Sequence, residues 1–172
     1  MVGIKTLRSS FVGVVSLLAM IWCGQPAMAS TTTATMPVAA TVIATCVVAA
    51  TPLVFGNYTS STATATETTA TITVNCTPGA AYEVGLDGGQ NGNTTTRKMK
   101  GSAGTDMLNY GIFSNSGHTQ NWGALGSADT VKGTGLGGTS QDQLLTVYGR
   151  IPAGAVTPVG VYTDVVTVTV SY

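Results

Sequence analysis

Few side chains in this chain of 172 residues have the chemistry of a catalytic group. Its single histidine, His118, lies in the polar stretch 114–120. A serine or cysteine nucleophile needs an adjacent base, and every such pair here would have to use His118. No G-x-S-x-G motif is present, and the acidic residues that could act in pairs on a sugar are scattered. We therefore expect His118 to be an exposed loop residue and the protein not to be an enzyme.

Two other patterns resemble ligand sites but lack an essential part. Residues 133–138 match G-x-G-x-x-G, yet no helix pattern follows them, as a dinucleotide-binding motif would require. Asp87, Asn91 and Asn93 resemble a fragment of a calcium loop without its closing bidentate glutamate. A turn between strands explains these three residues more simply. The sequence therefore predicts no cofactor and no metal.

Residues 1–29 have the features of a secretory signal peptide. Lys5 and Arg8 supply positive charge, the apolar run 11–22 follows, and Ala-Met-Ala at 27–29 forms a cleavage site. The apolar run has about a dozen residues, whereas a membrane-spanning helix needs roughly 20. We expect an exported chain whose mature part has no membrane span.

Cys46 and Cys76 are the two cysteines outside this signal, since Cys23 falls within it. An even number of cysteines in an exported protein argues for one disulfide. That bond would close a loop of about 30 residues and contribute on the order of 3–4 kcal/mol. Two free buried thiols are the alternative. A metal site is disfavoured because these cysteines and the distant His118 do not supply four suitably spaced ligands.

The charge of the exported part argues against nucleic-acid binding. Five basic residues face seven acidic ones, which gives a net charge near −2, and only 8% of the whole chain is charged. Arg97, Lys98 and Lys100 form the one basic cluster, which we interpret as a solvated loop because it is too small for a nucleic-acid footprint. The length of the exported part fits a single domain.

The sequence shows no sustained helical period. Short strand patterns alternate with segments rich in Gly, Asn, Pro and Thr. Residues 59–68 are expected to be a loop or loose edge, and 115–142 an irregular excursion anchored by Trp122. A β-sandwich is predicted, with a β-barrel as the alternative. The predicted strands are 42–49, 53–58 (an apolar end turning outward), 69–76, 81–86, 97–99, 108–114, 143–151 and 159–172.

Alternating apolar residues mark both ends of the exported part. Near the front they are Met36, Val38, Ala40 and Val42. At the back they are Tyr162, Val166, Val168, Val170 and Tyr172, with Asp164 interrupting the row. A period of two predicts an extended strand with one buried face. A strand that opens a chain and stands apart from the rest can pair with a different molecule.

The order and spacing of several short motifs resemble those of the spore coat U-like domain, the subunit domain of archaic chaperone–usher pili. The resemblance covers nearly the whole exported part. Each motif is weak alone, and their order together with the two cysteines is specific. The motifs are Thr45-Cys46, Leu53–Gly56, Ile72–Cys76, Tyr82–Gly89, Arg97 with Met99, Leu108–Phe113, Trp122-Gly123, Tyr148–Pro152 and Gly160–Asp164.

This resemblance implies an incomplete immunoglobulin-like β-sandwich, whose open groove is completed by a donor strand from a neighbouring subunit or a chaperone. The donor strand would point Met36, Val38, Ala40 and Val42 inward, while Pro37, Ala39 and Thr41 face outward. Ala40 is smaller than usual for the family, and Pro37 cannot donate a ladder hydrogen bond. Contact with the groove or the chaperone would come from Val166, Val168, Val170 and Tyr172, the last through its terminal carboxylate.

The expected organisation is a signal peptide at 1–29, a donor-strand extension at 30–44 and a pilin domain at 45–172. The resemblance implies a structural subunit of a surface pilus that supports adhesion and biofilm formation. Its partners would be identical or related pilin subunits, a periplasmic chaperone and an outer-membrane usher. Such a subunit is exported through the periplasm to a cell-surface fimbria. The alternatives are a secreted spore or cyst coat protein and a surface-binding module that uses residues 115–142.

Overall fold

The computed structural model describes residues 28–138 and 141–172, so nearly all of the predicted signal peptide lies outside the described residues. The chain divides into two units, Met1–Ala39 and Ala40–Tyr172. The described part of the first unit, 28–39, forms no strand and is exposed throughout. The second unit contains every strand that the structure describes.

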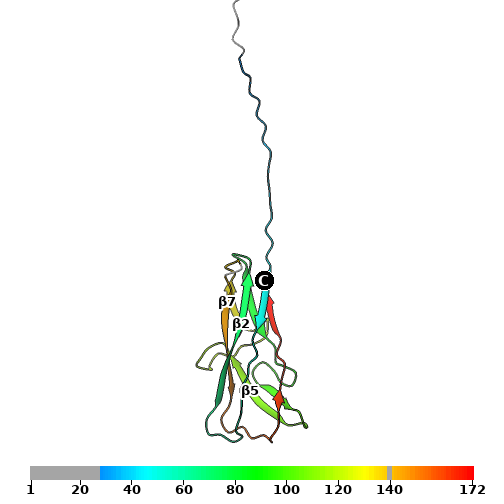
Figure 1. Cartoon of the computed structure of the whole chain (residues 1–172), viewed down its shortest axis with the longest axis vertical. Coiled ribbons are helices and arrows are strands. Elements are labelled where there is room, and N and C mark those ends of the chain that lie inside the picture. The colour runs from blue at the N-terminus through cyan, green and yellow to red at the C-terminus, as the bar shows by residue number, and fades with distance from the viewer. Residues whose placement is uncertain (1–27, 139–140) are drawn as a thin grey trace, which may run out of the picture. The chain divides into compact units, whose positions relative to one another are not determined.

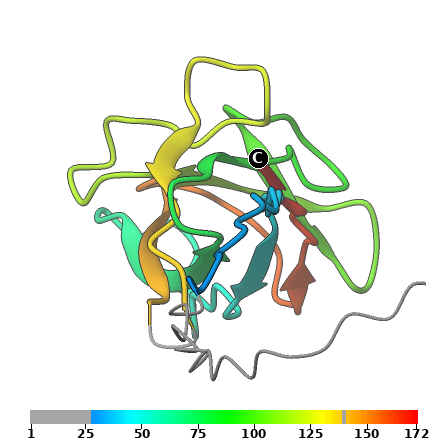
Figure 2. The same cartoon turned by 90° about the horizontal axis from the view of Figure 1, so that it is seen from above.

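The second unit is an all-β domain of nine described strands (Figures 1 and 2). They form a six-stranded sheet in the order β1-β2-β7-β5-β4-β8 and a three-stranded sheet in the order β6-β3-β9. Every strand pairing is antiparallel. Among the described residues, no helix is long and apolar enough to cross a membrane. The strands are β1 Cys46–Ala50, β2 Thr66–Cys76, β3 Ala81–Leu86, β4 Arg97–Gly101, β5 Met107–Phe113, β6 Val131–Thr134, β7 Gln143–Ile151, β8 Tyr162–Thr163 and β9 Val168–Ser171.

The core lies between the two sheets and follows the period-two patterns of the sequence. On β2, the residues Ala70, Ile72, Val74 and Cys76 are buried, while their neighbours are half-buried or exposed. Trp122 is buried as predicted, and its indole N–H donates a 2.9 Å hydrogen bond to the carbonyl of Val84. This bond fixes part of the irregular segment between β5 and β6 to β3 of the three-stranded sheet. The predicted two-layer sandwich is therefore confirmed.

The disulfide between Cys46 and Cys76 is present, as predicted. The two residues lie opposite each other in the register of β1 and β2. The bond therefore fastens the edge strand β1 to its neighbour β2 in the six-stranded sheet. It fixes the place where the domain begins after the extended N-terminal residues.

Several strand predictions were wrong in part. Residues 42–45 of the predicted strand 42–49 form no strand, and β2 begins at Thr66, inside the segment 59–68 that was expected to be a loop or loose edge. Strand β6 lies inside the segment 115–142 that was expected to be irregular. Residues 53–58 form no strand, although Leu53 and Phe55 still face inward. The closing segment 159–172 is interrupted, because β8 pairs with β4 in one sheet whereas β9 pairs with β3 in the other.

Candidate functional site

A groove with a volume of about 1100 Å³ opens along the inner face of the domain. Its rims are two chain segments, 50–60 after β1 and 157–166 before β9. These rims continue the outermost strands of the two sheets, since β1 ends the six-stranded sheet and β9 ends the three-stranded one. The floor is formed by apolar side chains and Tyr110 from five strands: Ala70, Ile72, Leu86, Met99, Leu108, Tyr110, Ile112, Val147 and Ile151.

The first rim is placed by two apolar side chains and one glycine. Leu53 and Phe55 are half-buried and pack against the core. An added Cβ at Gly149 of β7 would lie 2.8 Å from Leu53 Cδ2 and 3.1 Å from Phe55 Cζ, so the glycine lets both side chains approach the strand closely. The Phe55 ring also meets Tyr110 edge to face at 6.0 Å. The rim therefore lies against the sheet without becoming one of its strands.

Each rim contains a stretch of backbone that lacks backbone partners. Within the described residues, the backbone of 53–59 forms no hydrogen bond to other backbone groups, and neither does that of 164–166. Pairing on the first rim stops at Thr51, whose N–H donates 2.9 Å to the carbonyl of Thr71. An apolar groove between two such rims can accommodate an extended strand. The strand would pair its backbone donors and acceptors with the rims and place its apolar side chains on the floor.

The second rim has a strict alternation. Tyr162, Asp164, Val166, Val168 and Val170 are half-buried, and the residues between them are exposed. Tyr162, Asp164, Val166 and Val168 line the groove. Val170 packs on the core outside the groove lining, and Tyr172 is exposed.

Asp164 belongs to this inward row, although its carboxylate is polar. It accepts hydrogen bonds from Tyr110 Oη at 2.8 Å, the Gln90 N–H at 2.9 Å and the Val165 N–H at 2.9 Å. The sequence pattern treated Asp164 as an interruption. The structure instead shows a charged residue whose partners are supplied by the protein.

Arg97 corrects the interpretation of the basic cluster as a solvated loop. It begins β4 and its exposed fraction is 0%. Its guanidinium donates to four carbonyls at 2.8–3.0 Å, those of Leu86, Asp87, Thr94 and Trp122. A buried cation needs such compensation, and here backbone oxygens supply it. Lys100 is exposed and Lys98 half-buried, so the error concerns Arg97 most.

Three groups beside the groove have shifted pKa values. Burial lowers the pKa of the Arg97 guanidinium, which the nearby Tyr110, Asp87 and Asp164 oppose. Burial raises the pKa of Tyr110, and its hydrogen bond to Asp164 raises it further. For Asp87, burial raises the pKa, but hydrogen bonds from Thr167 and Gly89 and the charge of Arg97 outweigh it and hold the pKa below its ordinary value. At neutral pH the cluster therefore holds a neutral phenol, a carboxylate and a guanidinium.

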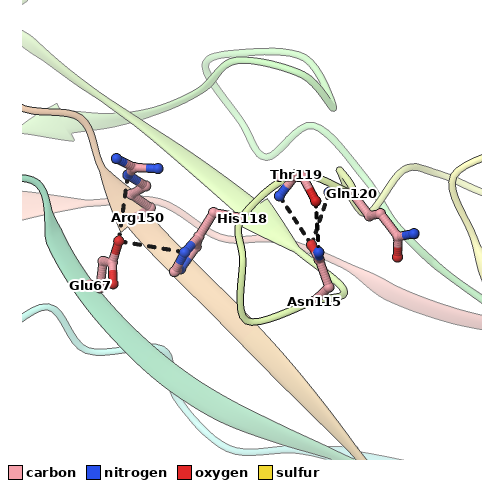
Figure 3. Close-up of polar contacts among 6 residues, drawn as sticks. All are labelled: Glu67, Asn115, His118, Thr119, Gln120 and Arg150. Carbon is pink, nitrogen blue, oxygen red and sulfur yellow. Dashed lines mark hydrogen bonds and ion pairs between the residues drawn. The ribbon is translucent and has the colours of Figure 1, made fainter.

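His118 does not lie in an exposed loop position, as the sequence had suggested. Its side chain is only 7% exposed, and it meets the rings of Phe113 and Tyr148 edge-on. Figure 3 shows Glu67 between His118 and Arg150, with Oε1 3.5 Å from His118 Nδ1 and 3.6 Å from Arg150 Nε. The loop that carries His118 closes on Asn115, whose side-chain oxygen accepts the N–H groups of Thr119 and Gln120. His118 fixes this loop to the sheet.

The predicted donor residues are accessible. Met36, Val38 and Val42 are 82%, 84% and 83% exposed, and Ala40 is also exposed. Met36 and Val38 belong to the first unit, and Ala40 and Val42 to the second. These four residues are absent from the groove lining and from the described strands. Within the described residues, no group of three or more His, Cys, Asp and Glu side chains is placed to hold a metal ion.

Comparison with known proteins agrees with this architecture. A chain of the CsuC-CsuE chaperone-tip adhesion subunit pre-assembly complex, from archaic chaperone-usher Csu pili of Acinetobacter baumannii, has a similar fold, with a TM-score of 0.57 and 23% sequence identity. The likeness covers 77% of the present chain and 41% of that chain. No curated protein sequence is a significant match. The family model of the Spore Coat Protein U domain matches residues 32–169. The chain belongs to the Spore Coat Protein U domain family.

Proposed function

We propose that this protein is a structural subunit of a surface pilus of the archaic chaperone–usher type and that it polymerises by donor-strand complementation. The groove is the observation that carries the proposal. It is apolar along its floor, and each of its two rims has a stretch, 53–59 or 164–166, whose backbone forms no hydrogen bond to other backbone groups within the described residues. Main-chain pairing along the rims would supply affinity, and alternate side chains in the groove would fix the register.

The donor strand in this proposal comes from a second copy or a related subunit. Residues Met36, Val38, Ala40 and Val42 enter the groove, and Ala39 and Thr41 face outward. The exposure of this apolar row supports the assignment, since apolar residues that alternate along an extended segment gain free energy when a partner covers them. Pro37 lacks an N–H, so pairing at that position is one-sided.

The proposed partners follow from the same groove. A periplasmic chaperone occupies it before assembly, and an outer-membrane usher exchanges the chaperone strand for that of the next subunit. Val166 and Val168 line the groove, and Val170 and the exposed C-terminus of Tyr172 lie further along the same rim. These four positions are the proposed chaperone contacts. The chaperone–subunit complex named for the similar structure supports this pairing.

The proposed location is the cell surface, reached through the periplasm after removal of residues 1–29, and the proposed role is adhesion and biofilm formation. A secreted spore or cyst coat protein of the same fold is the second candidate, and it is favoured by the name of the matched family. A surface-binding module is a third. The groove favours the pilus, because a strand acceptor joined to a donor-like extension makes a linear polymer.

The test of this proposal is the composition of surface fibres. Fibres sheared from cells that express the chain are purified, viewed by electron microscopy and identified by mass spectrometry. We expect thin fibres that contain this chain and vanish when its gene is deleted. Recovery of the chain from spore or cyst coats, with no fibre containing it, would contradict the pilus assignment and favour the coat role.

A further inference from the structure

The second rim of the groove crosses from one sheet to the other. Tyr162–Thr163 pair with β4, and Val168–Ser171 pair with β3. Between them, the backbone of 164–166 forms no hydrogen bond to other backbone groups within the described residues. The wall of the groove is thus least supported by backbone pairing at its middle, where it borders the cavity.

Two aspartates connect the rim to the loop after β3 near this unpaired stretch, one from each segment. Asp164, on the rim, accepts the N–H of Gln90 from the loop after β3 at 2.9 Å. Asp87, in that loop, accepts the N–H of Thr167 from the rim at 2.9 Å, and its own N–H donates 3.1 Å to the Thr167 carbonyl. Each segment therefore gives one carboxylate to the backbone of the other. We call these contacts the aspartate clamp.

The loop that receives the clamp is itself held in place. The buried Arg97 side chain donates to the carbonyls of Leu86 and Asp87, so the start of the loop is fixed to the core. At Gly89, φ is +71°, and an added Cβ would overlap the Asp164 carboxylate. Tyr110 Oη donates to the second oxygen of Asp164 from the groove floor. The Asp164 carboxylate is therefore held by three donors: the Gln90 N–H, the Val165 N–H and Tyr110 Oη.

We propose that Asp164 and Asp87 are positioning residues, which hold the groove wall 162–168 apart from the opposite rim so that a strand can enter. This inference rests on the proposed function. An open groove with an apolar floor is unfavourable in water, since movement of the wall onto the floor would bury apolar surface. Hydrogen bonds to charged acceptors are directional and stronger than neutral ones, so they oppose that movement.

The position of Asp164 fits a wall support better than a contact for the strand. It is the one charged side chain among the described residues that line the groove. Both of its oxygens are already occupied by Tyr110, Gln90 and Val165. A carboxylate that met an incoming apolar side chain without these partners would weaken binding, because its desolvation would be uncompensated.

The first measurement reads the clamp directly and does not depend on assembly. Hydrogen exchange of the full chain is followed by NMR for the wild type, Asp164→Ala and Asp87→Ala. We expect the Gln90 amide to exchange about tenfold or more faster in Asp164→Ala, and the Thr167 amide likewise in Asp87→Ala, since each loses a charged acceptor. Amides of β7 keep their rates. Unchanged exchange at Gln90 and Thr167 would show that the clamp does not hold the wall.

The second measurement follows uptake by the full chain of a labelled peptide that has the sequence of residues 32–44. Variants with a perturbed clamp are Asp164→Ala, Tyr110→Phe and Gly89→Ala. Asp106→Asn is a control for charge, since Asp106 is exposed. Gly126→Ala is matched to Gly89→Ala, because Gly126 has φ +84° with no atom within 4 Å of an added Cβ. Near-UV circular dichroism confirms that each variant is folded.

We expect the clamp variants to take up peptide about tenfold or more slowly than the wild type, and the two controls to match it. A purely structural role would lower uptake only in step with global stability, as measured by urea unfolding. Uptake by folded clamp variants at the wild-type rate would overturn this inference alone. A wild type that takes up no peptide and forms no fibres would contradict the proposed function as well.

Discussion

At the scale of single residues, three charged side chains beside the groove lie away from the surface: Arg97 is buried, and Asp87 and Asp164 are half-buried. Arg97, Asp87 and Asp164 meet beside the groove, where they bind backbone groups of the loop after β3 and of the groove wall. The two aspartates join this loop to the wall near the place where the chain changes sheet.

Replacement of Arg97 tests this role. Arg97→Ala leaves four carbonyls near the core without their donor, so we expect a loss of about 3 kcal/mol or more in the free energy of unfolding. Urea denaturation followed by tryptophan fluorescence measures the loss, because Trp122 is buried next to the guanidinium. Lys100→Ala is the control, since Lys100 is exposed on the same strand. Equal effects of the two substitutions would contradict the assigned role.

The sequence did not identify the burial of Arg97 or His118, for a physical reason. Arginine is almost never fully buried unless its donors are satisfied, and those donors are met here by carbonyls from three separate segments. His118 is covered by rings on β5 and β7 that lie far apart in the chain. Composition and local spacing carry no information about such partners.

At the scale of elements, the quality of prediction follows the clarity of the period-two pattern. Strands β3 and β7 have the predicted limits, Ala81–Leu86 and Gln143–Ile151, because apolar residues alternate there between turn-forming segments. Strand β6 has glycine at its third position and lysine at its second, so its sequence is typical of a loop. It is a strand because it pairs with β3, a tertiary contact.

The closing segment 159–172 shows the opposite error to β6, because a continuous strand was predicted where the structure has an interruption. Its regular alternation predicted one strand from 159 to 172, and every second side chain from Tyr162 to Val170 is indeed half-buried. The strand is interrupted because the two halves pair with different sheets. The polar residue in the row, Asp164, was the one local sign of that change.

The donor segment is tested by a charge placed on one face of the expected strand. Val38→Asp would put a carboxylate into an apolar groove, so we expect fibre assembly to fall at least tenfold. Ala39→Asp is the matched control, since residue 39 is assigned to the outward face and the variant should assemble normally. Sedimentation and electron microscopy of the two purified variants measure the difference. Equal assembly of both variants would contradict the assignment of Val38 to the inward face and Ala39 to the outward face.

At the scale of the whole molecule, the domain is a sandwich whose two sheets are not closed along one side. Strands β1 and β9, cyan and red in Figure 1, end the two sheets, contact one another and continue into the rims of the groove. The predicted sandwich followed from the number and spacing of strand patterns. The groove did not follow from those patterns, because its shape depends on which strands end each sheet, and only the resemblance to a known family implied it.

The central claim is that the groove of one copy receives residues 36–42 of another. Its most direct test is removal of residues 31–42 from the exported chain, followed by size analysis and electron microscopy in the presence or absence of a peptide with the deleted sequence. We predict that the shortened chain stays monomeric, keeps its Cys46–Cys76 disulfide and binds one peptide per copy. Fibres formed by the shortened chain without added peptide would contradict the claim.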